Sequence, residues 1–260
     1  MYIDTHCHLN DEAFINKEEE YLNKAHQAGV DIVFVVGWDL KSSIRAVELA
    51  NRFNGVYAII GLHPENIDSY SNDLWDQIRK LQKENRKVIA IGEIGLDFHW
   101  TKDLDIHRRQ EEIFIQQIEL ANELKLPISV HSRDASARTL AILKEHPPVF
   151  KGVMHCYSGS LEMAKEFIKL GMDISFAGPV TFKNAHEPKE VAANIPSENL
   201  LVETDAPYLA PQPFRGTTNE SKNIPFIVRE IAQLRNLSNK EIEQIVMDNV
   251  TRLFHVKQNG

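Results

Sequence analysis

Ionisable residues follow short apolar runs at six places in this chain. The strings at these six places are His6-Cys7-His8, Gly61-Leu62-His63-Pro64, Gly92-Glu93-Ile94-Gly95-Leu96-Asp97, His131-Ser132-Arg133-Asp134, His155-Cys156-Tyr157-Ser158-Gly159 and Glu203-Thr204-Asp205. Imidazole and carboxylate together suit Zn, Mn, Fe, Co or Ni, and a carboxylate-rich site with water would also accept Mg. The pattern indicates a metal site at which several strand ends meet.

His6 and His8 lie two residues apart on an expected strand. Side chains at this spacing leave the strand on the same side, so one metal ion could accept both imidazoles. A pair of this kind is a weak motif alone, since two polar residues can simply mark a strand exit. His131 and His155 end two further expected strands and strengthen the metal interpretation.

Three acids stand at expected strand ends. Glu93 would face His6 and His8 across a barrel and could bridge two cations, although it could also cap a helix. Glu203 and Asp205 should both point inward, where their repulsion calls for a cation or a shared proton. Asp205 is therefore a candidate ligand, whereas Glu203 could act through a water or orient other ligands.

The two cysteines alternate with candidate ligands. Pleating should turn Cys7 and Cys156 toward the surrounding helices, where thiols pack as small buried groups. Nothing in their context suggests a secreted disulfide framework, so we expect free thiols in a reducing compartment.

Basic and aromatic residues follow several of the same strand ends. Arg133, Lys183 and Arg215 could bind a phosphate or carboxylate, or could belong to the solvated rim of a loop. The aromatic residues that could stack on a base or anchor their loops are Tyr157, Phe182 and Tyr208.

Eight strand-like runs alternate with amphipathic stretches. The runs are Met1–Thr5, Asp31–Val36, Val56–Gly61, Val88–Gly92, Pro127–Val130, Phe150–Met154, Met172–Phe176 and Leu200–Thr204. Helical patterns are clearest over Ile106–Leu124, Ala135–Glu145, Leu161–Leu170, Ile224–Arg235 and Asn239–Phe254. This alternation predicts a single (β/α)₈ TIM-barrel domain over residues 1–260, with an open doubly wound sheet as the alternative. In such barrels the active-site residues come from the C-terminal ends of the strands.

Composition excludes several classes of protein. The chain has 260 residues, 43% of them hydrophobic and 25% charged, and can bury a large core without metal or disulfide staples. No signal peptide or membrane-spanning run is apparent, so we expect a cytoplasmic protein without a membrane or obligate protein partner. The net charge of −8 argues against a long nonspecific nucleic-acid groove. It is compatible with a nuclease that holds a chain end at cations.

Taken together, the motifs resemble the TatD family of metal-dependent deoxyribonucleases, a branch of the amidohydrolase-like barrels. The matching strings are DTHCHL at 4–9, GLHP at 61–64, GEIGLD at 92–97, HSRDA at 131–135, HCYSG at 155–159, TFKNA at 181–185, ETDAPYLAP at 203–211, RG at 215–216 and NVTRLF at 249–254. They run in order over nearly the whole chain and are specific as a set.

The resemblance implies a site for two divalent ions, with Zn, Mn, Mg, Ni and Co as candidates. One ion would be held by His6, His8 and Asp205, and the other by His131 and His155. Glu93 would bridge them, and His63 and Glu203 would be further active-site residues. Many members carry basic residues after the Arg-Gly pair, whereas this chain has Thr217-Thr218. That departure weakens the expectation that this loop binds phosphate.

The activity implied is hydrolysis of DNA phosphodiester bonds by a metal-activated water, in the manner of a 3′–5′ exonuclease. Asp205, Glu203 and His63 would be the catalytic residues, with Asp205 accepting the proton of the water. The same arrangement could hydrolyse an ester or amide, including the ester of a D-aminoacyl-tRNA. A barrel that has lost catalysis and only binds metal is the third alternative.

Overall fold

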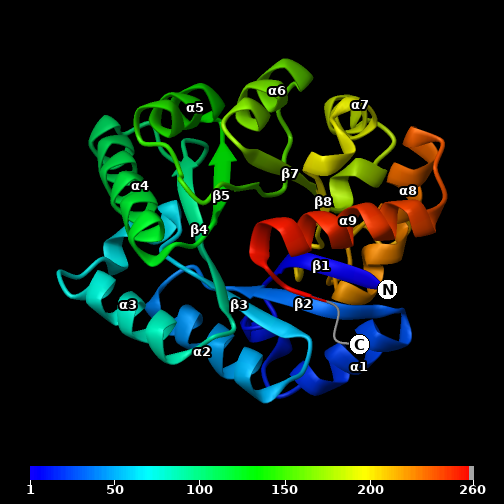
Figure 1. The fold of residues 1–260 in the computed structure, drawn as a ribbon, viewed down its shortest axis with the longest axis horizontal. Coiled ribbons are helices and arrows are strands. Elements are labelled where there is room, and N and C mark those ends of the chain that lie inside the picture. Colours follow the sequence, from blue (N-terminus) through cyan, green and yellow to red (C-terminus); the bar gives the residue numbers. More distant parts are fainter. Residues whose placement is uncertain (258–260) are drawn as a thin grey trace.

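Eight parallel strands form one sheet in which each strand pairs with its neighbours in the sequence. The computed structural model describes residues 1–257. Its strands are β1 (Tyr2–Cys7), β2 (Val30–Val36), β3 (Val56–Ile60), β4 (Val88–Asp97), β5 (Ile128–Arg133), β6 (Gly152–Met154), β7 (Met172–Phe176) and β8 (Leu200–Val202). This sequential order confirms the predicted (β/α)₈ barrel (Figure 1). The doubly wound alternative is wrong, because such sheets reverse their strand order near the middle.

The barrel closes where β8 meets β1. The Asp205 amide donates to the His6 carbonyl at 2.9 Å, and the His8 amide donates to the Ala206 carbonyl at 2.7 Å. These bonds join the C-terminal end of β1 and the residue after it to the segment that follows β8. They also bring the expected ligands of the first and last strands side by side.

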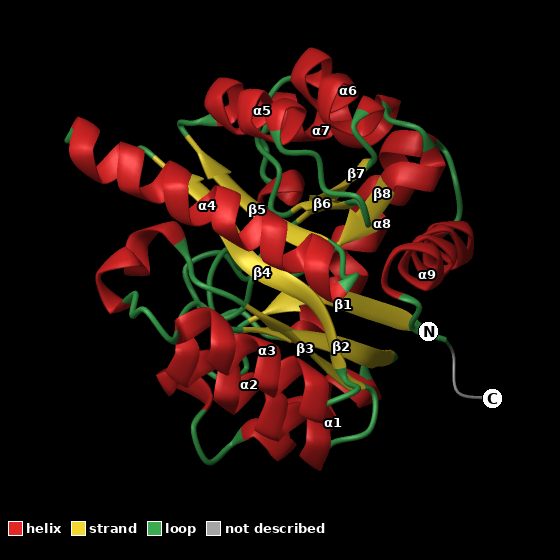
Figure 2. Ribbon diagram, turned by 60° about the vertical axis from the view of Figure 1, so that its left-hand side comes forward, coloured by secondary structure: helices red, strands yellow, loops and turns green. Residues whose placement is uncertain are grey.

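Helices surround the strands, as Figure 2 shows. They are α1 (Glu18–Gln27), α2 (Leu40–Arg52), α3 (Leu74–Glu84), α4 (Leu104–Leu124), α5 (Ser136–Glu145), α6 (Leu161–Lys169), α7 (His186–Asn194), α8 (Ile224–Arg235) and α9 (Asn239–Phe254), with short 3₁₀ turns η1 (Glu12–Phe14), η2 (Pro64–Ser69), η3 (Gly178–Thr181), η4 (Ser197–Asn199) and η5 (Ser221–Asn223). Within residues 1–257, no helix combines the length and the apolar character that a bilayer crossing requires.

The buried face of α4 shows how packing positions the site. Ile113 and Leu120 are buried against the strands, as the helical spacing predicts. Gln117 lies on the same face, and its side chain exchanges hydrogen bonds of 2.8 and 3.0 Å with the backbone of Leu62. A buried amide of this kind is stable only when it is bonded. Helix α4 therefore fixes the chain next to His63.

The two cysteines differ in position. Cys7 is buried and lies close to Tyr21 and Leu22 of α1, consistent with a packing role. The prediction that Cys156 turns toward the helices is wrong, because its side chain lines the central cavity. Strand β6 ends at Met154, and Cys156 has a φ of 44°. The alternation of a pleated strand therefore does not extend to this residue.

Candidate metal centre

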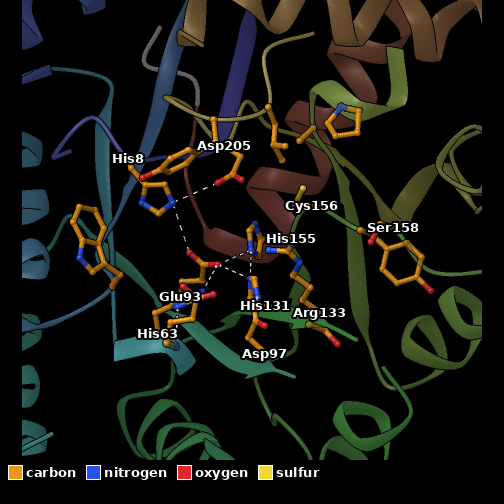
Figure 3. Close-up of a pocket in the computed structure, with 18 of the residues that line it drawn as sticks. His8, His63, Glu93, Asp97, His131, Arg133, His155, Cys156, Ser158 and Asp205 are labelled. Carbon is orange, nitrogen blue, oxygen red and sulfur yellow. Dashed lines mark hydrogen bonds and ion pairs between the residues drawn. The ribbon is translucent and has the colours of Figure 1, made fainter. Parts of the chain in front are cut away.

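The candidate ligands meet at the C-terminal ends of the strands, around a cavity of about 730 Å³. Six of the predicted metal-binding and catalytic residues line it, namely His8, His63, Glu93, His131, His155 and Asp205 (Figure 3). His6 and Glu203 lie behind these residues and are almost fully buried, with 1% of each exposed. The strand ends thus bring eight polar side chains from six strands to one place.

Glu93 lies at the centre of the cluster. It follows Gly92, at which a Cβ atom would stand 2.7 Å from the Ser129 Cβ and 2.9 Å from the Ile59 Cγ2. A side chain at residue 92 would therefore push β4 away from its neighbours. The glycine allows the close strand packing that holds the Glu93 carboxylate in place.

One Glu93 oxygen faces His6 of β1 and His8, which follows the end of that strand. The Glu93 Oε2 is 3.4 Å from the His6 Nε2 and 3.7 Å from the His8 Nε2. The Asp205 Oδ1 is 3.4 Å from the His8 Nε2 and 3.8 Å from the His6 Nε2. We call these four residues the first donor set.

The other Glu93 oxygen faces three more imidazoles. The Glu93 Oε1 is 2.7 Å from the His155 Nε2, 3.0 Å from the His131 Nδ1 and 3.3 Å from the His63 Nε2. The His131 Nδ1 and the His155 Nε2 are 3.3 Å apart. We call Glu93, His131 and His155 the second donor set, so that Glu93 belongs to both.

The spacing of the first donor set fits a divalent cation. Four ligands at about 2.1 Å from a tetrahedral ion stand about 3.4 Å from one another. The four distances between its imidazole nitrogens and carboxylate oxygens, 3.4–3.8 Å, are close to this value. Moreover, within residues 1–257 neither nitrogen of the buried His6 ring has a hydrogen-bond partner. A buried polar atom without a partner is costly, and an ion between these groups would remove that cost.

Hydrogen bonds on the far side of three rings determine which nitrogen points inward. The acceptors are the Val36 carbonyl for the His8 Nδ1 at 3.0 Å, the Asp97 Oδ2 for the His131 Nε2 at 2.9 Å and the Glu203 Oε1 for the His155 Nδ1 at 3.2 Å. Each outer nitrogen donates its proton to an oxygen, so the inner nitrogen of the neutral ring keeps a free lone pair. That arrangement is the one a metal-ligating histidine needs.

His63 has the opposite arrangement. Its Nδ1 accepts a hydrogen bond from the Glu65 amide at 3.1 Å, so the neutral ring carries its proton on Nε2. The Nε2 faces the Glu93 Oε1 and can donate to it. The geometry makes His63 a proton donor at the edge of the second donor set.

Two acids act on the histidines from behind. The Glu203 Oε1 accepts from the Cys156 amide at 2.8 Å as well as from His155, which supports an orienting role. Asp97 does the same for His131, and its Oδ1 accepts from the His99 amide at 2.9 Å. The sequence interpretation missed Asp97, although it ends the GEIGLD string and so carried a signal.

Charges within the cluster shift its pKa values. Burial alone would raise the pKa of Glu93, but the charges of His155 and His63 and the hydrogen bond from His131 hold it well below its usual range. Burial would likewise raise the pKa of Asp205, yet His8, His155 and His6 lower it. Burial, followed by the charge of His155, lowers the pKa of His6. Anionic carboxylates and a neutral imidazole are the forms that bind cations.

The three predicted basic residues are not equivalent. Arg133 lines the cavity, whereas Lys183 and Arg215 are exposed and stand outside its lining. The Arg215 guanidinium lies 4.6 Å from the centre of the Phe182 ring, and so is near Lys183 on the outer rim. Of the three residues, only Arg133 lines the cavity together with residues of the donor sets.

Comparisons with known proteins show the family to which the chain belongs. Residues 3–255 match the family described as TatD related DNase. The chain is 44% identical to the uncharacterized metal-dependent hydrolase YabD of Bacillus subtilis, covering 98% of this chain and 100% of that protein. It is 38% identical to the uncharacterized metal-dependent hydrolase YcfH of Escherichia coli K12, covering 98% and 96%.

A solved structure shows the same fold. The crystal structure of YjjV, a TatD homologue from Escherichia coli K12, superposes with a TM-score of 0.93 at 34% sequence identity, covering 98% of each chain. The family match spans nearly the whole chain, and the relatives align over 96–100% of their own length. The chain therefore belongs to the TatD family of metal-dependent hydrolases.

Proposed function

We propose that this protein hydrolyses phosphodiester bonds at the end of a DNA chain, as a 3′–5′ exonuclease would. The observation that carries the proposal is the position of Glu93, whose two oxygens face two separate donor sets at the base of one open cavity. Paired cation sites that share a carboxylate suit the displacement of one phosphate oxygen by another.

In this proposal His6, His8 and Asp205 would hold one ion, His131 and His155 would hold the other, and Glu93 would contribute to both. The mixed nitrogen and oxygen donors are compatible with Zn, Mn, Mg, Ni or Co. When bound, two such ions would lower the pKa of a water molecule and offset the charge on the phosphoryl oxygens.

The protein's own groups supply the proton transfers. The Asp205 side chain is 14% exposed, compared with 5% for Glu93, and it lines the cavity, so it can accept the proton of the attacking water. The His63 Nε2 carries a proton and can give it to the leaving oxygen. Arg133 can hold a neighbouring phosphate with its fork of donors.

The distribution of charge favours a chain end over a long duplex. Arg133 is the only lysine or arginine among the cavity-lining residues within the described part of the chain. A groove that tracks many phosphates needs a series of cations. A cavity with one arginine and two donor sets can neutralise only a few phosphates.

The test compares the wild-type protein with Asp205→Asn in the presence of each of several divalent ions. We expect the wild type to shorten single-stranded DNA, and the variant to lose nearly all turnover, because it loses a charged ligand and the proton acceptor. Glu65→Gln is the matched control, since Glu65 lines the same cavity but is outside both donor sets. Its turnover should stay near the wild-type value.

A D-aminoacyl-tRNA is assayed beside the DNA, because similar groups can polarise a carbonyl. Cleavage of that ester without cleavage of DNA in any metal would overturn the nuclease proposal and leave the donor sets in place. Near wild-type turnover by Asp205→Asn would overturn the site assignment itself.

A further inference from the structure

Trp100 is an exposed indole at the rim of the cavity. It lies three residues beyond the end of β4, lines the cavity and has 67% of its surface exposed. Leaving a large aromatic surface in water costs free energy, because the same surface would be stabilised by burial. An exposed indole beside a candidate active site is therefore a candidate contact for a flat ligand.

The guanidinium of Arg133 stands over this indole. Its Cζ lies 5.0 Å from the centre of the Trp100 ring. Arg133 is two residues beyond His131 on β5, so the two side chains leave the strand on the same side. Figure 3 shows Arg133 beside His131 and His155. The indole is thus linked through Arg133 to the second donor set.

Contacts between the ends of β4 and β5, and between the residues that follow them, hold Trp100 and Arg133 in place. Asp97 of β4 is in register with Arg133 of β5, and the Phe98 amide donates to the Arg133 carbonyl at 2.9 Å. The His99 Nδ1 lies 2.9 Å from an Asp134 carboxylate oxygen. The backbone that carries both side chains is therefore fixed by adjacent strands, which reduces the entropy lost when a ligand is bound.

Two tyrosines of the cavity lining have less suitable surroundings. Tyr208 is exposed in the cavity, but its hydroxyl lies 3.3 Å from a carboxylate oxygen of Asp11, which would repel a phosphate. Tyr157 is buried, and its hydroxyl donates to the Ser160 carbonyl, so it anchors its loop. In the described part of the chain, Trp100 is the cavity-lining aromatic that has an arginine over its ring.

We propose that Trp100 and Arg133 form a nucleotide subsite next to the second donor set. The indole stacks on a nucleobase, and the guanidinium binds the phosphate attached to that nucleotide. A nucleotide matches the pair because it joins a flat, weakly polar ring to an anion at short range. This inference rests on the proposed function and adds the part of the DNA that is recognised.

The test uses two short DNA strands of equal length and charge. One is an oligothymidylate, and the other carries tetrahydrofuran abasic units at every position. We expect Trp100→Ala to raise the KM for the oligothymidylate about tenfold, within the range of base–aromatic stacking, and to leave the KM for the abasic strand unchanged. Trp100→Phe should restore most of the lost affinity, because it keeps an aromatic face.

Two further variants separate the roles of the pair. Arg133→Ala should weaken binding of both strands and should reduce the salt dependence of binding by about one phosphate contact. Leu104→Ala is the matched control, because Leu104 is 70% exposed on the next segment of chain yet is outside the cavity lining. It should bind both strands as the wild type does.

A binding measurement without catalysis completes the design. In EDTA, a strand containing 2-aminopurine should lose fluorescence on binding to the wild type and not on binding to Trp100→Ala. If DNA is cleaved but Trp100→Ala behaves as the wild type with both strands, the subsite is wrong and the proposed function stands. If the wild type quenches 2-aminopurine but cleaves no DNA in any metal, the subsite stands and the proposed function is wrong. If the wild type neither quenches 2-aminopurine nor cleaves DNA, both the subsite and the proposed function are wrong.

Discussion

At the scale of single residues, the partners of the histidines matter as much as the histidines themselves. His8, His131 and His155 each donate from the outer nitrogen to an oxygen of the protein, and each therefore turns toward Glu93 the nitrogen that can bind a cation when the ring is neutral. His63 receives a hydrogen bond on its outer nitrogen and presents a proton instead. Four histidines in one cavity are thus divided into two kinds by their hydrogen bonds alone.

Asp97→Asn tests this division at His131. The variant has one acceptor oxygen for two donors, the His131 Nε2 and the His99 amide, so it should hold the ring less firmly. We expect the affinity for Mn²⁺ or Zn²⁺ to fall by about 10–100-fold, which is the usual effect of losing such a partner. Titration calorimetry of the metal-free protein measures this directly.

The matched control for that variant is Asp134→Asn. Asp134 lies on the neighbouring loop, also pairs with a histidine, and is exposed. It makes no contact with either donor set, so its metal affinity should equal that of the wild type. Equal affinities for Asp97→Asn and Asp134→Asn would mean that Asp97 does not position His131.

At the scale of elements, the apolar runs and their order predicted the barrel, but not every strand end. The sequence predicts that strand β4 stops at Gly92, where the apolar run ends. In the structure it continues to Asp97, since pairing with β5 goes on from Ile94 opposite Val130 to Asp97 opposite Arg133. The local sequence did not indicate that Asp97 belongs to this strand, because the length of a strand depends on its pairing with the neighbouring strand.

Cys156 shows the opposite case, a residue that lies beyond the end of its strand. The two-residue periodicity of a strand does not apply beyond the end of β6, where the backbone has a positive φ and the side chain enters the cavity. Similarly, no local pattern distinguishes Trp100 from an ordinary loop residue. The residues of the donor sets were predictable because strand ends of a barrel meet, whereas loop side chains depend on contacts between loops.

The contact between β7 and α9 gives a prediction about stability. Arg252 of α9 donates to the buried Asp173 of β7 at 2.6 Å. Burial raises the pKa of Asp173, although Arg252 and Asn199 partly offset the effect. Since the folded protein then holds the proton more tightly than the unfolded chain, this group stabilises the fold at low pH. That stabilisation is lost as the pH rises above the ordinary Asp value of about 4.

Arg252→Met removes the guanidinium that partly offsets the burial of Asp173. The stability lost as the pH rises should therefore be larger in this variant than in the wild type. We expect the free energy of unfolding to fall by about 1–3 kcal/mol at pH 8, because the carboxylate of Asp173 is left buried and unpaired. The decrease should be smaller at pH 5, where protonation relieves it. Urea denaturation at the two pH values measures the difference. Asp173→Asn combined with Arg252→Met should regain stability at pH 8, and no recovery would show that the charge of Asp173 is not the cause.

At the scale of the whole molecule, the core and the donor sets are separate. Apolar side chains from all eight strands and from the surrounding helices are buried without help from the ligand residues. Chelation should therefore abolish hydrolysis while leaving the far-UV circular dichroism spectrum unchanged, and added Mn²⁺ or Mg²⁺ should restore activity. Unfolding on chelation, as occurs in small zinc domains, would contradict this separation.

If the proposed function holds, the charge of the whole chain predicts how a DNA strand enters the cavity. With a net charge of −8 and one arginine in the cavity lining of the described residues, few phosphates can be neutralised at once. The logarithm of the binding constant for single-stranded DNA should fall with the logarithm of salt concentration at a slope of only about −1 to −2, since each phosphate contributes about −0.7. A circular single strand has no end to enter the cavity, so it should resist hydrolysis under conditions that degrade its linearised form. Cleavage of the circle at the same rate, or a slope several times steeper, would mean that the DNA crosses the outer surface of the protein along a path that includes Lys183 and Arg215.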